Sequence, residues 1–250
     1  MNVRSQKVCI QNIGELITMN IPNHQGPICF SEIPLIEILQ HAYVMIEGQQ
    51  IAHYGSMNDC PRQEADEIID AQNKTLLPGF VDPHTHLVFA GSREHELEAR
   101  ILEQMTKGER MSGGINTTVK ATREASKEEL LQQAKKRLDL MLKHGTTTVE
   151  AKSGYGLNLE TEIKCLEVIQ ILDHTHPVDI VPTFLGAHAI PTEVPYENYV
   201  EDVLKMIPVM TAHKLAKFCD VFCEQGFFTL EDTRKILNFA RQHHLQLKIH

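Results

Sequence analysis

Two histidines separated by one residue end an apolar run in the segment PGFVDPHTH, residues 78–86. Side chains two residues apart in an extended strand point to the same side, so His84 and His86 can present both imidazoles to one ion. Neutral imidazole is a common ligand of Zn²⁺, at Zn–N distances of about 2.0–2.1 Å. We therefore predict that this pair binds a divalent metal ion.

A second pair with the same spacing, His174 and His176, has a different context. It lies between an amphipathic segment and a proline, and no strand precedes it. We expect a solvated loop there and no metal site. In a chain with 14 histidines the spacing alone is weak evidence, and the apolar platform before His84 is what favours the first pair.

The elements that must position His84 form a repeated pattern of short apolar strands and longer amphipathic helices. We predict strands at 76–86, 145–153, 178–189, 219–225 and 245–250. Ser126 with Glu129 forms a capping box, and Asn158 and Thr229 are N-caps of the later helices. Strands that alternate with helices run parallel through right-handed crossovers. The pattern indicates an α/β fold, either a doubly wound sheet or a (β/α)8 barrel.

Residues 1–78 differ from the rest of the chain. Prolines interrupt short β-rich runs there, which predicts a small all-β region. The remaining residues hold about five strand–helix units, whereas a complete barrel needs eight. We therefore expect either a barrel cut at its fifth strand or a complete five-stranded open sheet.

Charge and composition narrow the function classes. The chain has 24 Lys and Arg against 33 Asp and Glu, a net charge of −9, and no basic run, which argues against nucleic-acid and anionic-membrane partners. No stretch approaches the ~20 apolar residues of a membrane span, and the first residues lack the apolar core of a signal peptide, so we expect a cytoplasmic protein. The six cysteines are scattered, and we expect free thiols.

Four segments together resemble the imidazolonepropionase family of the metal-dependent amidohydrolase superfamily. They are LLPGFVDPHTHLVFAGSRE, GTTTVEAKSGYGLNLETE, VDIVPTFLGAHAIP and the closing LKIH. The motif PGFVDPHTH alone indicates only the superfamily, which includes dihydroorotases, cytosine and guanine deaminases and ureases, while GYGL and FLGAHA narrow the resemblance to one family. It implies the N-terminal part of a β-sandwich domain over 1–78, and a partial (β/α)8 TIM-like barrel, about five of eight strands, over 79–250.

The resemblance implies a hydrolase with one zinc or iron ion. The reaction would convert 4-imidazolone-5-propanoate to N-formimidoyl-L-glutamate in histidine degradation, so the expected partner is this small molecule, and a homodimer is compatible with the sequence. By motif position the metal ligands are His84, His86 and His250. The substrate-binding residues are Arg93 as a fork for the propionate, Tyr155 through its hydroxyl, and His188 through a hydrogen bond to the ring carbonyl.

The general base is the open part of this hypothesis. The family places it after the position of His250, so we expect it beyond residue 250. Glu150 is an acidic alternative at the end of the second barrel strand, and Lys152 either positions it or lies in a solvated loop. An open barrel leaves strand edges unpaired, so we expect weak or absent activity from these 250 residues alone. Another cyclic amidohydrolase or deaminase, or an inactive metal-binding fragment, is the alternative.

Overall fold

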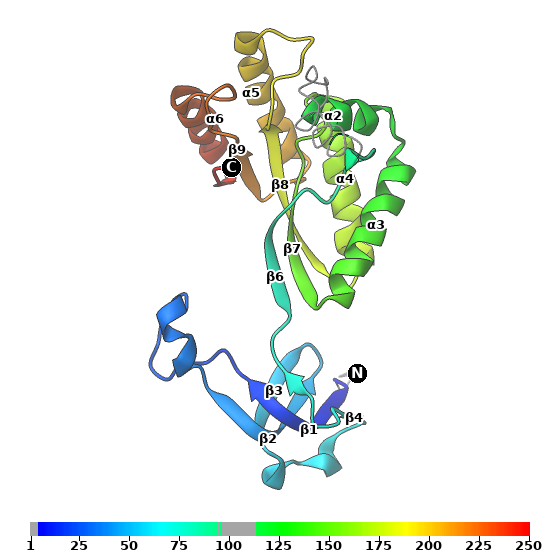
Figure 1. Cartoon of the computed structure of the whole chain (residues 1–250), viewed down its shortest axis with the longest axis vertical. Coiled ribbons are helices and arrows are strands. Elements are labelled where there is room, and N and C mark those ends of the chain that lie inside the picture. Colours follow the sequence, from blue (N-terminus) through cyan, green and yellow to red (C-terminus); the bar gives the residue numbers. More distant parts are fainter. Residues whose placement is uncertain (1–4, 95, 97–113) are drawn as a thin grey trace, which may run out of the picture. The chain divides into compact units, whose positions relative to one another are not determined.

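The computed structural model describes residues 5–94, 96 and 114–250. Contacts within the chain divide it into two compact units, Met1–Pro78 and Gly79–His250 (Figure 1). The site predicted from the sequence lies entirely in the second unit.

The smaller unit is built on one five-stranded sheet. Its elements are β1 (Lys7–Ile17), η1 (Phe30–Leu35), β2 (Ile38–Glu47), β3 (Gln50–Ser56), η2 (Met57–Asp59), η3 (Arg62–Glu64), β4 (Glu67–Asp70) and β5 (Thr75–Leu76). The strand order is β3-β2-β1-β4, and β5 also pairs with β1. Because side chains alternate along β2, Ala42 and Val44 contribute to one apolar cluster while Tyr43 and Met45 contribute to another.

The larger unit is an α/β structure around one parallel sheet. Its strands are β6 (Phe80–Thr85), β7 (Thr146–Lys152), β8 (Asp179–Ala187), β9 (Phe218–Val221) and β10 (Gln246–Leu247), and its helices are α2 (Ile115–Glu124), α3 (Lys127–Lys143), α4 (Leu159–Thr175), α5 (Tyr196–Ala212) and α6 (Leu230–Gln242). Each strand from β7 to β10 pairs in parallel with the strand before it in the chain. A doubly wound sheet reverses its order at a switch point, so these strands exclude that alternative.

The predicted helix starts are confirmed. The Ser126 hydroxyl accepts the Glu129 N–H, and the Glu129 carboxylate accepts the Ser126 N–H in return. Asn158 accepts the Thr161 N–H at the start of α4, and Thr229 accepts an N–H in the first turn of α6. These caps satisfy N–H groups that have no partner within the helix, which explains why the helices begin where they do.

Two predicted strands are shorter in the structure. The strand expected at 219–225 ends at Val221, and the one expected at 245–250 is regular only over Gln246–Leu247. The chain nevertheless follows β9 to its last residue, because the His250 N–H donates to the Val221 carbonyl at 3.0 Å. That hydrogen bond fixes the backbone of His250 beside the end of β9.

The second histidine pair differs in part from the expected solvated loop. His174 is exposed in the last turn of α4. His176 is buried, and its Nε2 lies 3.2 Å from Asp139 Oδ1. The solvated-loop prediction is therefore wrong for His176, because the end of α4 turns its ring toward α3.

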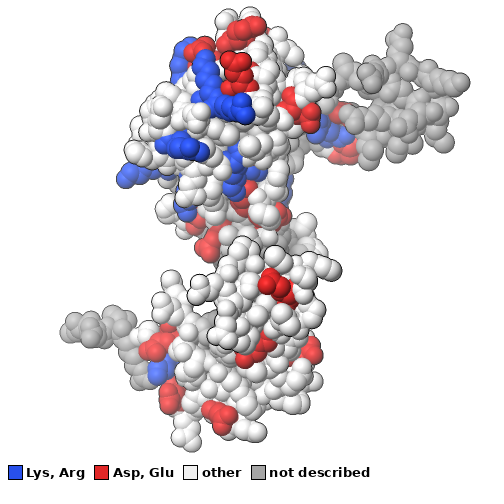
Figure 2. All heavy atoms as spheres, turned by 90° about the vertical axis from the view of Figure 1, so that its left-hand side faces the viewer, with Lys and Arg blue, Asp and Glu red and all other residues white. Residues whose placement is uncertain are grey.

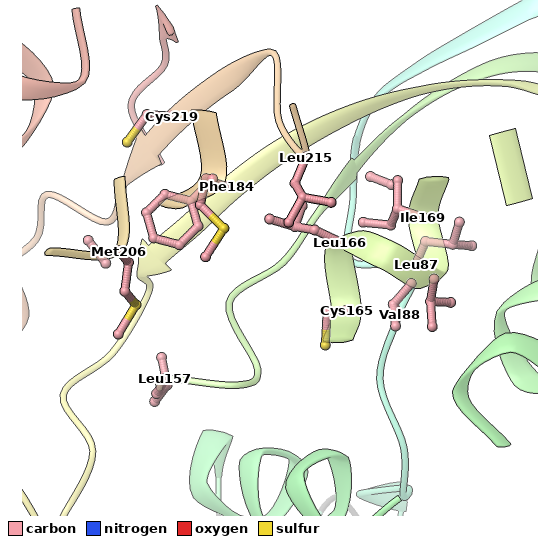
Figure 3. Close-up of a cluster of buried hydrophobic side chains, with 14 of the residues drawn as sticks. Leu87, Val88, Leu157, Cys165, Leu166, Ile169, Phe184, Met206, Leu215 and Cys219 are labelled. Atoms are coloured by element: carbon pink, nitrogen blue, oxygen red, sulfur yellow. The ribbon is translucent and has the colours of Figure 1, made fainter. Parts of the chain in front are cut away.

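The helices bury one face against the sheet. Figure 3 shows Phe184 of β8, Leu166 and Ile169 of α4, and Leu87 and Val88 after β6 in one cluster, and all five are at most 2% exposed. Figure 2 shows Lys and Arg interspersed with Asp and Glu on the visible surface of this unit. No helix among the described residues is long and apolar enough to cross a membrane.

The orientation of α3 predicts a contrast between two leucines of that helix. Leu138 is fully buried and Leu140 is 56% exposed. We expect Leu138→Ala to lower the free energy of unfolding by about 2–5 kcal/mol, because it leaves a cavity, and Leu140→Ala to change it by less than about 0.5 kcal/mol. Urea unfolding monitored by circular dichroism measures both. Equal losses would contradict the orientation of α3.

Candidate metal and substrate site

Three histidines converge from opposite edges of the larger sheet. His84 lies in β6, His86 follows it, and His250 follows β10. Strands four positions apart in a flat sheet would be separated by about 19 Å. The rings of His84 and His250 are nevertheless only 4.5 Å apart, and one nitrogen from each of the three imidazoles lies within 4.8 Å of the others. The sheet must therefore curve strongly to bring its edges together.

Burial disfavours the charged form of two of these imidazoles, His86 and His250. Burial, reinforced by the neighbouring His188 and His250, lowers the pKa of His86 to about 2. Burial also lowers the pKa of His250. Neutral imidazole is the form that binds metal, and His86 Nδ1 is buried with no hydrogen-bond partner in the described part of the chain. A divalent cation suits this donor set, because it would satisfy a buried nitrogen that otherwise lacks a partner.

Tyr155 and His188 lie against the same cluster. The His188 ring stacks on His86 with centroids 4.6 Å apart, and the Tyr155 ring lies 5.2 Å from His86 and 5.3 Å from His188. The structure thus brings the histidine cluster together with two of the three predicted substrate-binding residues.

One hydrogen bond sets the tautomer of His188. Its Nδ1 lies 2.9 Å from the Gly154 carbonyl oxygen, which can only accept, so Nδ1 carries the proton. Burial lowers the pKa of His188 to about 4, which leaves the ring neutral near pH 7. Its Nε2 is therefore a hydrogen-bond acceptor. That role differs from the expected bond to a ring carbonyl, which would require a donor.

A buried carboxylate that the sequence interpretation missed holds the Tyr155 loop. The Oε1 of Glu162, in α4, accepts the N–H groups of Gly154, Gly156 and Leu157 at 2.8–3.1 Å. Burial raises the pKa of this carboxyl group, and the N–H donors act in the opposite direction. The sequence signal for this anchor was an acidic residue in the first turn of a helix that follows a glycine-rich loop.

The two glycines beside Tyr155 are required by this arrangement. Gly154 has φ +109°, and a Cβ there would lie 2.8 Å from the Leu185 carbonyl oxygen. A Cβ at Gly156 would lie 2.7 Å from the Glu162 backbone nitrogen. A larger residue at either position would therefore displace the loop that carries Tyr155.

Arg93 lies near Tyr155 in a cavity of about 440 Å³. The cavity is lined by Phe89, Gly91, Ser92, Arg93, Glu94, Thr118, Arg137 and Tyr155. Burial raises the pKa of Tyr155, and the positive charge of Arg93 acts in the opposite direction. Arg137 is committed elsewhere, since it donates to the Leu87 and Phe89 carbonyls. Arg93 is exposed and is the more available of the two cations for an anion.

Glu150 and Lys152 belong to a buried ionic network. Glu150 Oε1 lies 2.9 Å from both Lys152 Nζ and Lys248 Nζ, and it also accepts the Thr183 hydroxyl. Burial opposes the charge of Glu150, but these donors hold its pKa below the usual value, which makes it a weak base. Lys152 is 2% exposed, so the solvated-loop alternative for Lys152 is wrong. Its ammonium positions Glu150 instead.

The Glu162 anchor predicts a measurable loss of stability. In Glu162→Gln, an amide replaces the carboxylate that accepts the loop N–H groups, and we expect a loss of about 1–3 kcal/mol in the free energy of unfolding. Glu160→Gln is the matched control, because Glu160 is exposed in the same first turn of α4. Urea unfolding compares the two variants. Similar values for both would contradict an anchoring role of Glu162.

Sequence comparison links the chain to proteins of known function. The Amidohydrolase family model matches residues 67–107. The chain is 45% identical to the imidazolonepropionase of Alkaliphilus metalliredigens over 97% of its own length and 59% of that protein. It is 46% identical to that of Geobacillus kaustophilus over 96% of its length and 59% of that protein. The chain therefore spans about three fifths of the length of these relatives.

Solved structures support the fold. E. coli guanine deaminase superposes with a TM-score of 0.64 at 13% identity, over 98% of this chain and 53% of that one. A mutant of atrazine chlorohydrolase from Arthrobacter aurescens, complexed with zinc and atraton, superposes with a TM-score of 0.58 at 15% identity, over 97% of this chain and 52% of that one. At such identities the likeness concerns the fold alone. The sequence matches confirm the resemblance seen in the motifs, and the chain is a homologue of the imidazolonepropionases over nearly its whole length.

Proposed function

We propose that residues 79–250 are part of a (β/α)8 barrel that hydrolyses 4-imidazolone-5-propanoate to N-formimidoyl-L-glutamate in histidine degradation. The observation that carries the proposal is the convergence of His84, His86 and His250 beside Tyr155 and His188. Sequential parallel strands and a curved sheet support the barrel, whose catalytic groups lie at the carboxyl ends of its strands. The 45% identity to imidazolonepropionases supports the reaction.

In this proposal His84, His86 and His250 hold one zinc or iron ion. A bound divalent ion lowers the pKa of its water to roughly 7 and polarises the bond under attack. The histidines contribute by lying close together before the ion arrives, and no proton has to leave His86 near pH 7. Imidazole ligands suit both metals.

Three side chains would orient the substrate. The Arg93 guanidinium matches a carboxylate in a two-point hydrogen bond and would bind the propionate. The Tyr155 hydroxyl would donate to the same ligand. His188 Nε2, as an acceptor, would bind an N–H of the imidazolone ring, which revises the role that the sequence predicts for it. Together these contacts would hold the ring beside the three histidines.

Glu150 has no role as the general base in this proposal. Two ammonium groups and a hydroxyl already contact one of its oxygens, so it would bind a proton weakly. That the base lies outside these 250 residues stays a prediction. Among the described strands β6 and β10 each have one partner, so we still expect little turnover from the 250 residues alone. Binding is therefore the more direct readout.

Metal binding tests the first part of the proposal. We expect purified, chelator-treated protein to bind Zn²⁺, and His86→Ala to weaken that binding by more than about 100-fold, because it removes one of three ligands. His174→Ala is the control, since His174 is exposed and belongs to the second histidine pair with the same spacing. Competition with a chromophoric chelator measures the affinities. Equal affinities for both variants would exclude the site.

Substrate recognition is tested with a stable ligand, imidazole-4-propanoate, and calorimetry of the Zn²⁺-loaded protein. We expect Arg93→Ala to weaken binding by about 10- to 150-fold, the loss of a charged hydrogen bond, and Arg93→Lys to weaken it less. A control ligand, 4-ethylimidazole, lacks the carboxylate, so the Arg93→Ala change should not affect its affinity. Equal losses for both ligands would contradict the assignment of Arg93 to the propionate. This test also separates a protein with a carboxylate-recognising substrate site from one that merely binds metal.

A further inference from the structure

We infer that Asp220 is a positioning residue for His250, and that the buried Lys152 holds Asp220 in place. The inference rests on the proposed metal site and goes beyond its ligands. Asp220 lies in β9, next to the strand that leads to His250, and it is 1% exposed. Its Oδ2 lies 3.5 Å from His250 Nδ1.

The carboxylate of Asp220 is fixed from two sides. Lys152 Nζ, which comes from β7, lies 2.7 Å from Oδ2. The Val221 N–H donates to Oδ1 at 2.9 Å. Asp220 therefore has little freedom to rotate, and its Oδ2 stays directed toward both the ammonium and the imidazole.

The charges of this network balance without His250. Two carboxylates, Glu150 and Asp220, face two ammonium groups, Lys152 and Lys248. Burying such groups costs free energy that their mutual attraction only partly offsets, so a buried ion pair is seldom retained for stability alone. The network lies directly against the end of β10, where it can serve the third ligand.

His250 has no other partner for the nitrogen that faces Asp220. Within the described chain its Nδ1 is buried and makes no hydrogen bond. The separation of 3.5 Å is at the upper limit for a hydrogen bond, and a small rotation of the imidazole closes it. With its proton on Nδ1, the ring offers the Nε2 lone pair to a cation. A carboxylate behind a histidine ligand fixes the tautomer and increases the basicity of the coordinating nitrogen.

Asp220→Asn tests the inference. It keeps the shape of the side chain and removes the charge behind His250, and we expect the Kd for Zn²⁺ to rise by about 10- to 100-fold. Asp139→Asn is the matched control, because it weakens the carboxylate contact to a histidine outside the site, His176. Its Zn²⁺ affinity should equal that of the wild type.

A double variant tests whether the loss of Zn²⁺ affinity in Asp220→Asn comes only from misfolding around an unpaired Lys152. Asp220→Asn leaves Lys152 with one fewer partner, whereas Asp220→Asn with Lys152→Met removes the buried pair as a unit and leaves Glu150 paired with Lys248. The double variant should show the same loss of affinity. Long-range ¹H–¹⁵N spectra of the Zn²⁺-loaded wild type need no variant, and they should show the His250 proton on Nδ1.

The outcomes separate this inference from the proposed function. If the wild type binds no Zn²⁺, the proposed metal site itself fails. If it binds Zn²⁺ and both variants keep its affinity within about twofold, the positioning role of Asp220 is overturned. A His250 proton on Nε2 would overturn it equally, whether or not the variants fold.

Discussion

The two edge strands of the larger sheet, β6 and β10, bring their histidines together only because the sheet is curved. In a flat sheet they would be about 19 Å apart, whereas the rings of His84 and His250 are 4.5 Å apart. Every other feature of the site depends on that curvature. Because all five strands run in the same direction, their carboxyl ends lie at the same end of the sheet, and the side chains that follow them face a common space.

At the carboxyl ends of these strands, polar groups are buried away from water, so each needs a hydrogen-bonding or ionic partner. Glu162 accepts three N–H groups of the loop that carries Tyr155. Lys152 bridges Glu150 and Asp220 at 2.9 and 2.7 Å. These anchors do not touch the proposed substrate. Glu162 holds the loop that carries Tyr155, and Lys152 holds the carboxylate beside His250, so the histidine cluster keeps its shape before an ion or a substrate binds.

Much of the fold could be predicted from the sequence because the signals are local. Helix caps depend on residues three positions apart, and the predicted caps at Ser126, Asn158 and Thr229 are confirmed. Strand ends were less predictable. The apolar pattern continues past Val221, but regular strand pairing ends there because the chain turns at the carboxyl end of the sheet. The residues after the turn belong to the site and no longer pair regularly with a neighbouring strand.

The sequence by itself determined the α/β pattern, the glycine-flanked Tyr155 loop and the His84–His86 pair on its apolar platform, since each arises from residues within a few positions of one another. The family resemblance added His250 as a third ligand, and only the tertiary structure decided that Lys152 is buried between two carboxylates and that Asp220 stands behind His250. Lys152 and Asp220 are 68 residues apart in the chain. Contacts over such separations depend on the curvature and register of the whole sheet, and no local pattern of residue types encodes them.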